Sequence, residues 1–304
     1  MRIYDRFGRR IRNLRIIVTT RCNYRCIFCH SEGYYHCLRN KNEELDPHII
    51  RLIGIVARRF GVDQVKITGG EPLLRRDIAD IIAIFESLGY KDISIVTNGS
   101  LLREYASELK EAGLDRINIS LPSLRESRYD YITQTSGYFR RVMAGIDEAL
   151  SVGLNPVKIN VVLLRGINDD EWMDFIRFGE EKGVHIQFIE FHTANPNSPE
   201  YMRFHRPLDD IEDYLRKVSI KMIKREMHAR RKYRLESGID IEIVSPMYNP
   251  EFCANCTRIR ATPTGWKPCL LRDTVVEFGE NIRDQRLLAK KFLEAISIRE
   301  PFFT

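Results

Sequence analysis

Residues 14–29 of the chain read LRIIVTTRCNYRCIFC, and this stretch decides the fold class. Its first part, residues 14–18, is a short apolar run rich in β-branched residues, which is typical of a buried strand. Its second part places Cys22, Cys26 and Cys29 in the loop that follows. Thiolates bind iron–sulfur clusters and zinc, and a four-iron cluster normally takes four of them. Three thiols therefore leave one iron open, where a substrate-like molecule can bind.

Zinc is the competing metal for this loop. Structural zinc takes four closed ligands, and the nearby candidates for the fourth are His30 and Cys37. His30 directly follows a ligand, so we expect it to point elsewhere, whereas Cys37 is within reach. The spacing favours a cluster and leaves zinc open. A disulfide is not expected, because the three thiols are odd in number and crowded.

Residues 20–29 resemble the signature loop of radical S-adenosylmethionine (SAM) enzymes, including the aromatic Phe28 directly before the third cysteine. The resemblance implies that Cys22, Cys26 and Cys29 hold a 4Fe-4S cluster. It also implies that the amino and carboxylate groups of SAM bind the fourth iron and that electron transfer yields a 5'-deoxyadenosyl radical. In such enzymes the cofactors carry the chemistry and the protein positions them.

Composition indicates a globular chain with a substantial core. With 304 residues and 43% hydrophobic content, the chain is long enough for one barrel-sized domain and an appendage. It contains no apolar run of about 18 residues, and its Arg-rich N-terminus lacks the apolar segment of a secretory signal. The seven cysteines divide into two sets of three and Cys37, and oxygen-sensitive clusters and unpaired thiols fit a reducing compartment. We therefore expect a cytoplasmic protein without a membrane partner.

The net charge of +6 is concentrated in two basic runs. They consist of Arg6, Arg9, Arg10, Arg12 and Arg15, and of Lys224, Arg225, Arg230, Arg231, Lys232 and Arg234. A charge run is usually a solvated face. The alternative is a funnel for a polyanion such as a nucleoside triphosphate, and the second run leaves both interpretations open. No nucleic-acid partner is expected, because no DNA- or RNA-binding motif accompanies the charge.

Short β-branched runs alternate with amphipathic stretches of helical length up to about residue 191. The predicted strands are Arg15–Val18, Gln64–Thr68, Ile93–Thr97, Arg116–Leu121, Lys158–Leu164 and His185–Phe191. The predicted helices are Pro47–Phe60, Ile78–Leu88, Tyr105–Ala112, Tyr138–Val152 and Asp170–Lys182. This alternation predicts an α/β fold with a parallel sheet, a partial (β/α)6 TIM-like barrel. Its active site would lie at the carboxyl ends of the strands.

Polar motifs follow several of these strands. They are residues 69–72 (GGEP), Asn98-Gly99, Ser120, and Glu190 with His192. Singly, the glycine motifs are typical of turns, but their repetition at one end of consecutive strands favours a shared site.

After Phe191 the pattern changes to a polar, Pro-containing loop at residues 193–199. A helix at Asp209–Val218, a hairpin strand at Ile239–Val244 and a terminal helix at Gln285–Ile298 are predicted beyond it. We expect residues 1–220 to form the barrel domain and residues 221–304 an extension docked on the barrel mouth.

A second set of three thiols lies in this extension. Cys253, Cys256 and Cys269 are separated by two and twelve residues. An auxiliary 4Fe-4S cluster with an open iron and a zinc site are equally compatible with this spacing. Zinc would need a further donor, such as Cys37 or His228.

With Arg258 and Arg260 directly behind Cys256, this set narrows the resemblance to the GTP 3',8-cyclases of molybdenum cofactor biosynthesis. Other similar stretches are residues 7–15, 67–77, 116–121, 166–170 and 188–191, so the likeness covers nearly the whole chain. It implies that GTP is converted to 3',8-cyclo-7,8-dihydro-GTP: a hydrogen leaves the ribose 3' carbon, which then attacks C8 of guanine.

The resemblance also implies a set of site residues. SAM would be positioned by Phe28, Gly70, Glu71 and Ser120. Cys253, Cys256 and Cys269 would hold a second cluster that binds guanine, while Arg258 and Arg260 would act beside the substrate. Arg15, Lys66 and Lys158 would meet the triphosphate. Arg15 and Lys158 also have an ordinary interpretation as edge or snorkelling residues. Yet Lys158 precedes an apolar run in which an unpaired ammonium is costly.

Implied partners are an electron donor such as ferredoxin or flavodoxin, a downstream cyclic pyranopterin synthase, and a second copy in a homodimer. The chain departs from the family pattern at Lys66 (often Arg), His192 (often Met) and Val96 (often Thr). It also lacks the frequent C-terminal Gly-Gly, and its distal spacing predicts a shortened turn near residues 263–265. The rival hypotheses are a peptide-modifying radical enzyme, and a non-catalytic electron carrier or zinc-stabilised nucleic-acid binder.

Overall fold

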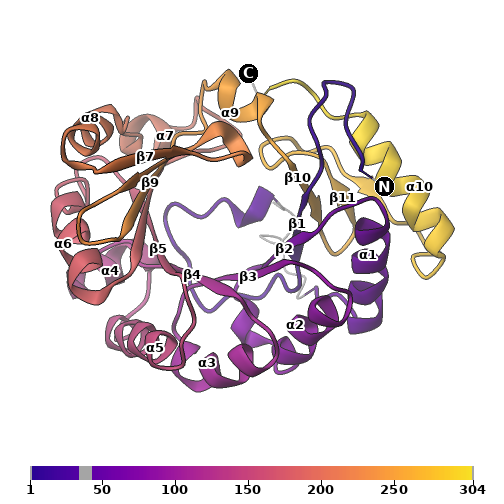
Figure 1. Cartoon of the computed structure of the whole chain (residues 1–304), viewed down its shortest axis with the longest axis horizontal. Helices are drawn as coiled ribbons and strands as arrows, with labels where there is room; N and C mark the ends of the chain where they lie inside the picture. Colours follow the sequence, from indigo (N-terminus) through magenta and orange to yellow (C-terminus); the bar gives the residue numbers. More distant parts are fainter. Residues whose placement is uncertain (1, 34–42, 303–304) are drawn as a thin grey trace.

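The computed structural model describes residues 2–33 and 43–302. Six parallel strands follow one another around an incomplete ring, each hydrogen-bonded to the next in chain order (Figure 1). They are β1 (Asn13–Ile17), β2 (Gln64–Thr68), β3 (Asp92–Thr97), β4 (Arg116–Ser120), β5 (Val157–Leu163) and β6 (His185–Glu190). All six predicted strands are confirmed, because β-branched runs bounded by turn residues define strands locally.

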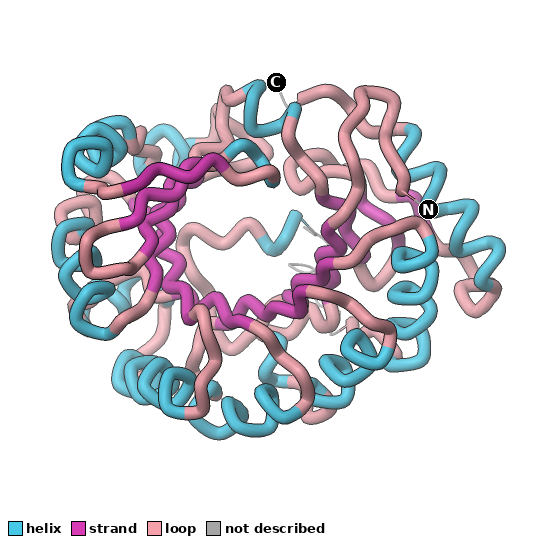
Figure 2. The backbone as a smooth tube through the Cα atoms, in the orientation of Figure 1, coloured by secondary structure: helices cyan, strands magenta, loops and turns pink. Residues whose placement is uncertain are grey.

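Helices cover the outer side of this ring (Figure 2). They are α1 (Pro47–Arg59), α2 (Ile78–Ser87), α3 (Leu102–Glu111), α4 (Glu126–Thr133), α5 (Phe139–Ser151) and α6 (Trp172–Lys182). Helix α1 begins where Asp46 accepts hydrogen bonds from the backbone of His48 and Ile49, with Pro47 at its first position. The five predicted helices are confirmed, whereas α4 was not predicted.

The C-terminal part of the chain adds strands to both edges of the ring. At one edge β9 (Asp240–Val244) pairs with β6, and at the other β10 (Arg258–Ala261) pairs with β1, both in parallel. Antiparallel strands then extend each edge: β8 (Arg231–Arg234), β7 (Lys221–Lys224), β11 (Gly265–Lys267) and β12 (Val276–Glu277). The predicted hairpin strand is therefore β9, and it also belongs to the main sheet. The division of the chain at residue 220 stays a prediction.

The remaining helices pack around this sheet. They are α7 (Pro199–Phe204), α8 (Asp209–Val218), α9 (Pro250–Ala254) and α10 (Gln285–Ser297), with short 3-10 turns at Ser31–Gly33, Pro72–Leu74 and Met227–Ala229. The predictions of α8 and α10 are confirmed. In α10, Phe292 stacks on Phe60, the residue that follows α1, with ring centroids 5.2 Å apart, and it meets Trp266 of β11 edge-on at 4.9 Å. Among the described residues, no helix combines the length and apolarity needed to cross a membrane.

Side chains alternate between the two faces of the strands, and this alternation divides the core from the site. Ile16, Ile67 and Ile119 are fully buried within the apolar core. Arg15 and Lys66, one residue earlier on their strands, line the interior of the ring and are register partners on β1 and β2. The ring therefore has an apolar outer face beneath the helices and a polar, basic inner face.

Candidate active site

A cavity of about 1020 Å³ lies inside the ring. Its lining includes all but one of the predicted site residues: Cys22, Cys26, Cys29, Cys253, Cys256, Cys269, Phe28, Gly70, Ser120, Arg15, Lys66, Lys158, Arg258 and Arg260. The exception is Glu71, which does not line the cavity. The fold thus brings together residues that are up to 254 positions apart in the sequence, from Arg15 to Cys269.

The first thiol loop, residues 20–29, is held against the end of β2 by backbone hydrogen bonds. Gly70 donates from its amide to the carbonyl of Thr19 at 2.9 Å, and Glu71 donates to that of Arg21 at 2.7 Å. On the other side, Ile27 donates to the carbonyl of Ile132 in α4 at 2.9 Å. The loop is therefore fixed from both sides before any ligand binds.

Gly70 is required by this close approach. A Cβ atom built at Gly70 would lie 2.1 Å from the carbonyl oxygen of Arg21 and 2.8 Å from that of Thr20. At Gly69 it would lie 2.4 Å from the carbonyl oxygen of Thr19. Because these contacts are to backbone, no rotamer change relieves them. The Gly-Gly pair thus brings β2 and the thiol loop together, which is more than turn chemistry.

Glu71 links two strand ends instead of facing the cavity. Its carboxylate accepts hydrogen bonds from the Thr97 hydroxyl and the Asn98 amide, both at 2.6 Å, and from the Leu73 amide at 2.9 Å. Burial raises the pKa of Glu71 to about 7, although these donors act in the opposite direction. The contacts place Glu71 as a brace between β2 and β3, and its role toward SAM stays a prediction.

The first three thiols have the chemistry that a cluster needs. All are free, and burial is the main reason that the pKa of Cys22 rises to about 11 and that of Cys26 also rises. Among the described residues, no three His, Cys, Asp or Glu side chains converge tightly enough to enclose a single ion. A four-iron cube spreads its ligands more widely, and the three soft donors of this loop fit it.

The second thiol loop is anchored by two arginines from opposite ends of the chain. Arg9 donates to the carbonyl of Cys253 at 3.1 Å, and Arg299 donates to that of Cys256 at 2.8 Å. Asp5, whose side chain is 0% exposed, forms ion pairs with Arg9 at 2.6 Å and with Arg299 at 3.0 Å. The sequence did not reveal this triad, which explains part of the N-terminal basic run as structural.

Several cations of the cavity are buried with few partners. Lys66 donates from Nζ to the Asn118 side-chain oxygen at 2.8 Å, and burial lowers its pKa well below the ordinary value. Arg258 contacts the sulfur of Met227 at 3.3 Å. Arg260 is 4% exposed, and its Nε has no hydrogen-bond partner among the described residues. Such uncompensated charge favours an anionic ligand.

Arg15 differs because it has a carboxylate partner. Its Nη2 lies 2.7 Å from Glu32, which also accepts a hydrogen bond from the Thr68 hydroxyl at 3.1 Å. Burial by itself would raise the pKa of Glu32, but Arg15 and neighbouring cations outweigh it and hold the pKa at about 2. Glu32 was not predicted, since nothing in the sequence pairs it with Arg15.

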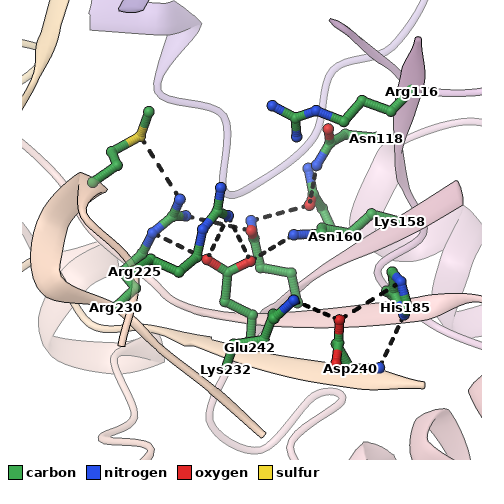
Figure 3. Close-up of polar contacts among 12 residues, drawn as sticks. Arg116, Asn118, Lys158, Asn160, His185, Arg225, Arg230, Lys232, Asp240 and Glu242 are labelled. Atoms are coloured by element: carbon green, nitrogen blue, oxygen red, sulfur yellow. Dashed lines mark hydrogen bonds and ion pairs between the residues drawn. The ribbon is translucent and has the colours of Figure 1, made fainter. Parts of the chain in front are cut away.

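A second buried carboxylate, Glu242 of β9, gathers three cations (Figure 3). Its oxygens lie 2.5 Å from Lys158 Nζ, 3.1 Å from Arg225 Nη1 and 3.2 Å from Arg230 Nε. We call these four residues the Glu242 cluster. Lys158 is therefore paired, as the cost of a lone buried ammonium requires. Burial lowers the pKa of Lys158 to about 8, although Glu242 acts in the opposite direction.

The second basic run thus divides between the two predicted roles, a charged lining for a polyanion and a face outside the cavity. Arg225 and Arg230 line the cavity. Lys232 pairs with Asp240 at 2.7 Å, and Arg231 with Glu212 at 2.9 Å, away from the cavity lining. The alternation of strand side chains does not give this division, because Arg230 and Lys232 stand two residues apart and would share a face of a regular strand. The division depends on the turn between β7 and β8, where Arg230 precedes the first residue of β8.

Three histidines complete the lining. His30 and His192 have ring centroids 4.9 Å apart, and burial lowers the pKa of His192 to about 3. His228 stacks on Phe252 of α9 at 3.8 Å. All three line the cavity, as does Val96. Cys37, the other donor considered for zinc, lies outside the described residues.

Two family models match the chain in succession. The model of the Radical SAM superfamily matches residues 16–179, and the model Molybdenum Cofactor Synthesis C matches residues 184–304. The chain belongs to the radical SAM superfamily. The first resemblance is therefore confirmed.

Relatives place the chain more narrowly within the superfamily. It is 42% identical over 310 residues to a probable GTP 3',8-cyclase of Methanothermobacter thermautotrophicus, with 100% of both chains covered. A probable GTP 3',8-cyclase of Saccharolobus solfataricus is 44% identical over 310 residues, with 98% of each chain covered. The chain is thus a radical SAM protein of the GTP 3',8-cyclase family, as the second resemblance predicted.

Several solved structures share the fold. Streptococcus suis SuiB bound to S-adenosylmethionine matches 92% of this chain and 65% of its own, with a TM-score of 0.66 and 16% identity. The hydrogenase maturase HydG from Carboxydothermus hydrogenoformans matches 98% and 68%, with a TM-score of 0.58 and 14% identity. At such identities the likeness concerns the fold alone, and it agrees with the predicted partial barrel.

Proposed function

We propose that this radical SAM protein converts GTP to 3',8-cyclo-7,8-dihydro-GTP, the first step of molybdenum cofactor biosynthesis. One observation carries the proposal: both thiol triads line a single cavity whose charged lining is mostly cationic. Among its lining residues are thirteen Lys or Arg against three Asp or Glu. A cavity of this sign attracts a polyanion such as a nucleoside triphosphate.

Cys22, Cys26 and Cys29 would hold the first 4Fe-4S cluster, and Cys253, Cys256 and Cys269 a second one. When bound, the first cluster and SAM supply the radical that removes the hydrogen from the ribose 3' carbon. The protein fixes the geometry of both loops: Gly70 and α4 brace the first, and Arg9 and Arg299 anchor the second. Such preorganisation holds reacting groups in line and excludes side reactions.

SAM would lie near Phe28, Gly70 and Ser120, which line the cavity beside the first thiol loop. Glu71 would act behind them, because its carboxylate fixes the ends of β2 and β3. This arrangement offers backbone polar groups and the Ser120 hydroxyl to the zwitterionic methionine part of SAM. Polar groups held on rigid strands can fix the orientation of such a ligand.

The triphosphate would lie against Arg15, Lys66 and Lys158, with Arg258 and Arg260 beside the reacting nucleoside. Arg258 and Arg260 alternate on β10, and Arg260 is the register partner of Arg15 on β1. These side chains therefore stand in neighbouring positions on one face of the sheet. Guanidinium groups suit phosphate oxygens because they can donate two parallel hydrogen bonds.

The wider setting follows from the same chemistry. An external donor such as ferredoxin or flavodoxin would supply electrons, and a cyclic pyranopterin synthase would take the product. The thiols of both loops form no disulfide and would need a reducing compartment, for which the cytoplasm is the proposed location. We further propose that residues 1–220 form the barrel domain and residues 221–304 its extension. We also propose that the protein forms a homodimer.

The decisive experiment is an anaerobic assay of the iron-reconstituted protein with dithionite, SAM and GTP. It follows 5'-deoxyadenosine and guanine-derived products. We expect GTP-dependent formation of both, and loss of the cyclised product in Cys22→Ala and Cys269→Ala. Deoxyadenosine without any change in GTP would reject the substrate and favour a radical enzyme that modifies a peptide. A fully loaded cluster that never cleaves SAM would reject the enzyme.

A further inference from the structure

The Glu242 cluster carries more positive than negative charge at a buried position. Glu242 is 0% exposed, and the side chains of Lys158 and Arg230 are each 10% exposed. Three cations thus share one carboxylate. An excess of buried charge is costly unless a counter-charge arrives. Another carboxylate in the cavity wall, Asp92, is already paired with Arg116 at 2.5 Å.

The geometry leaves the cations available to a ligand. Lys158, Arg225 and Arg230 line the cavity, whereas Glu242 does not. The Glu242 carboxylate therefore contacts the three cations from the side that faces away from the cavity. An ammonium has three donors and a guanidinium five, so each keeps N–H groups that Glu242 does not use. A ligand in the cavity can accept them.

A row of amide side chains connects this cluster to Lys66, and Figure 3 shows Asn118 and Asn160 of this row beside the cluster. From Lys66, hydrogen bonds run through Asn118 at 2.8 Å, Asn160 at 3.4 Å and Gln187 at 3.1 Å, and reach Arg230 at 3.4 Å. The row lies across β2, β4, β5 and β6. The row joins the Glu242 cluster to Lys66, which is already assigned to the triphosphate. The cluster and Lys66 therefore belong to one anion-binding surface of the cavity.

The turn between β7 and β8 fixes the two arginines relative to each other. The amide of Arg225 donates to the carbonyl of Arg230 at 2.9 Å and closes the turn. Inside it, Met227 accepts contacts from Arg230 at 3.8 Å and from Arg258 at 3.3 Å. The turn therefore holds its arginines next to a residue assigned to the nucleoside.

We propose that Arg225 and Arg230 are binding residues for the terminal phosphates of the substrate, and that Glu242 is the positioning residue that holds them and Lys158 in place. The inference rests on the proposed function, because it takes the substrate to be a nucleoside triphosphate. Arginines suit this task, since their planar donors match phosphate oxygens in pairs.

The test measures equilibrium binding of GTP, GDP, GMP and guanosine to the cluster-loaded protein without oxygen. In Arg225→Gln and Arg230→Gln we expect GTP binding to weaken roughly tenfold or more, GMP binding to weaken less, and guanosine binding to stay unchanged. In Glu242→Gln we expect GTP binding to weaken as well, although this variant makes the cavity more positive. Tighter GTP binding by Glu242→Gln would show that Glu242 only offsets charge and would overturn its positioning role.

Asp240→Asn is the matched control. It removes another buried carboxylate from β9, but one that pairs with Lys232 outside the cavity lining. We expect its preference for GTP over guanosine to equal that of the parent protein. Iron content and circular dichroism verify the fold of each variant. If Glu242→Gln does not fold, Arg225→Gln decides, because its side chain is 29% exposed and its loss leaves Glu242 paired.

An unchanged ratio of GTP to guanosine affinity in both arginine variants would overturn the inference. A parent protein that itself shows no preference for GTP over guanosine would instead overturn the proposed function. The two failures are therefore distinct.

Discussion

Arg299 donates a hydrogen bond of 2.8 Å to the carbonyl oxygen of Cys256, and its guanidinium lies 3.0 Å from the buried carboxylate of Asp5. The segment that follows the last helix, the N-terminal segment and the second thiol loop thus meet at one point. Arg9 completes the triad by donating to the Cys253 carbonyl. The loop that would hold the second cluster is therefore positioned by residues at both ends of the sequence.

Asp5→Asn should loosen this loop. The substitution leaves two buried guanidinium groups without their carboxylate, which costs about 3 kcal/mol or more in the free energy of unfolding. Urea unfolding measures that loss. In a background with Cys22, Cys26 and Cys29 replaced by Ala, bound iron reports the second loop alone, and we expect it to fall.

Glu251→Gln is the control, since it breaks an exposed ion pair with Lys224 next to the same thiol loop. It should alter neither the unfolding midpoint nor bound iron. Unchanged iron in Asp5→Asn would show that the triad does not position the loop.

Gly70→Ala should displace the first thiol loop. Its Cβ would lie 2.1 Å from the Arg21 carbonyl oxygen, so the backbone must move. We expect loss of the first cluster, measured as bound iron in a Cys253, Cys256 and Cys269 triple-Ala background. Gly89→Ala is the control: it has open space and a φ of +72°, and should cost only about 1 kcal/mol of strain while keeping iron. Full iron loading of Gly70→Ala would contradict the close approach.

The local parts of the fold could be predicted from the sequence. Strands and helices of the barrel follow from apolar periodicity, and both thiol loops from their spacing. Short edge elements such as β11 and β12 were missed, because two or three residues carry no periodic signal. Helix α4 was missed as well, since Glu126–Thr133 has only a weak apolar face, with three buried residues.

The pairings inside the cavity could not be predicted, because they depend on register between distant segments. Lys158 and Glu242 are 84 residues apart in the sequence, and their contact exists only once β9 joins β6. A signal was nevertheless present: Asp240 and Glu242 alternate with isoleucines in residues 239–243, which indicates a strand with a polar inner face. Arg258 and Arg260 were predictable through the resemblance alone.

Phe292→Ala should destabilise the whole barrel. The ring is fully buried between Phe60, just after α1, and Trp266 of β11. Its removal loses buried apolar surface and also leaves a cavity. We expect a loss of about 3–5 kcal/mol in the free energy of unfolding, measured with urea. Leu293 lies on the same helix and is 43% exposed. Leu293→Ala should therefore change the free energy of unfolding by less than about 1 kcal/mol. Equal effects would mean that α10 is not part of the core.

Binding of GTP should weaken as the pH rises through about 8. Burial lowers the pKa of Lys158 to about 8, so the ammonium is charged below this pH and neutral above it. Glu242 contacts Lys158 together with Arg225 and Arg230, and it stays ionised in this range because its pKa lies well below its usual value. The loss of one positive charge near the phosphates should then raise the Kd of GTP roughly tenfold between pH 7.5 and 9.

Two substitutions separate Lys158 from other titrating groups. Lys158→Arg keeps its charge at all these pH values, so the step near pH 8 should vanish while GTP binding at pH 7.5 persists. Lys158→Gln should bind GTP weakly at pH 7.5 and show no step either. A step that survives in both variants would assign the titration to another group and remove Lys158 from the phosphate site.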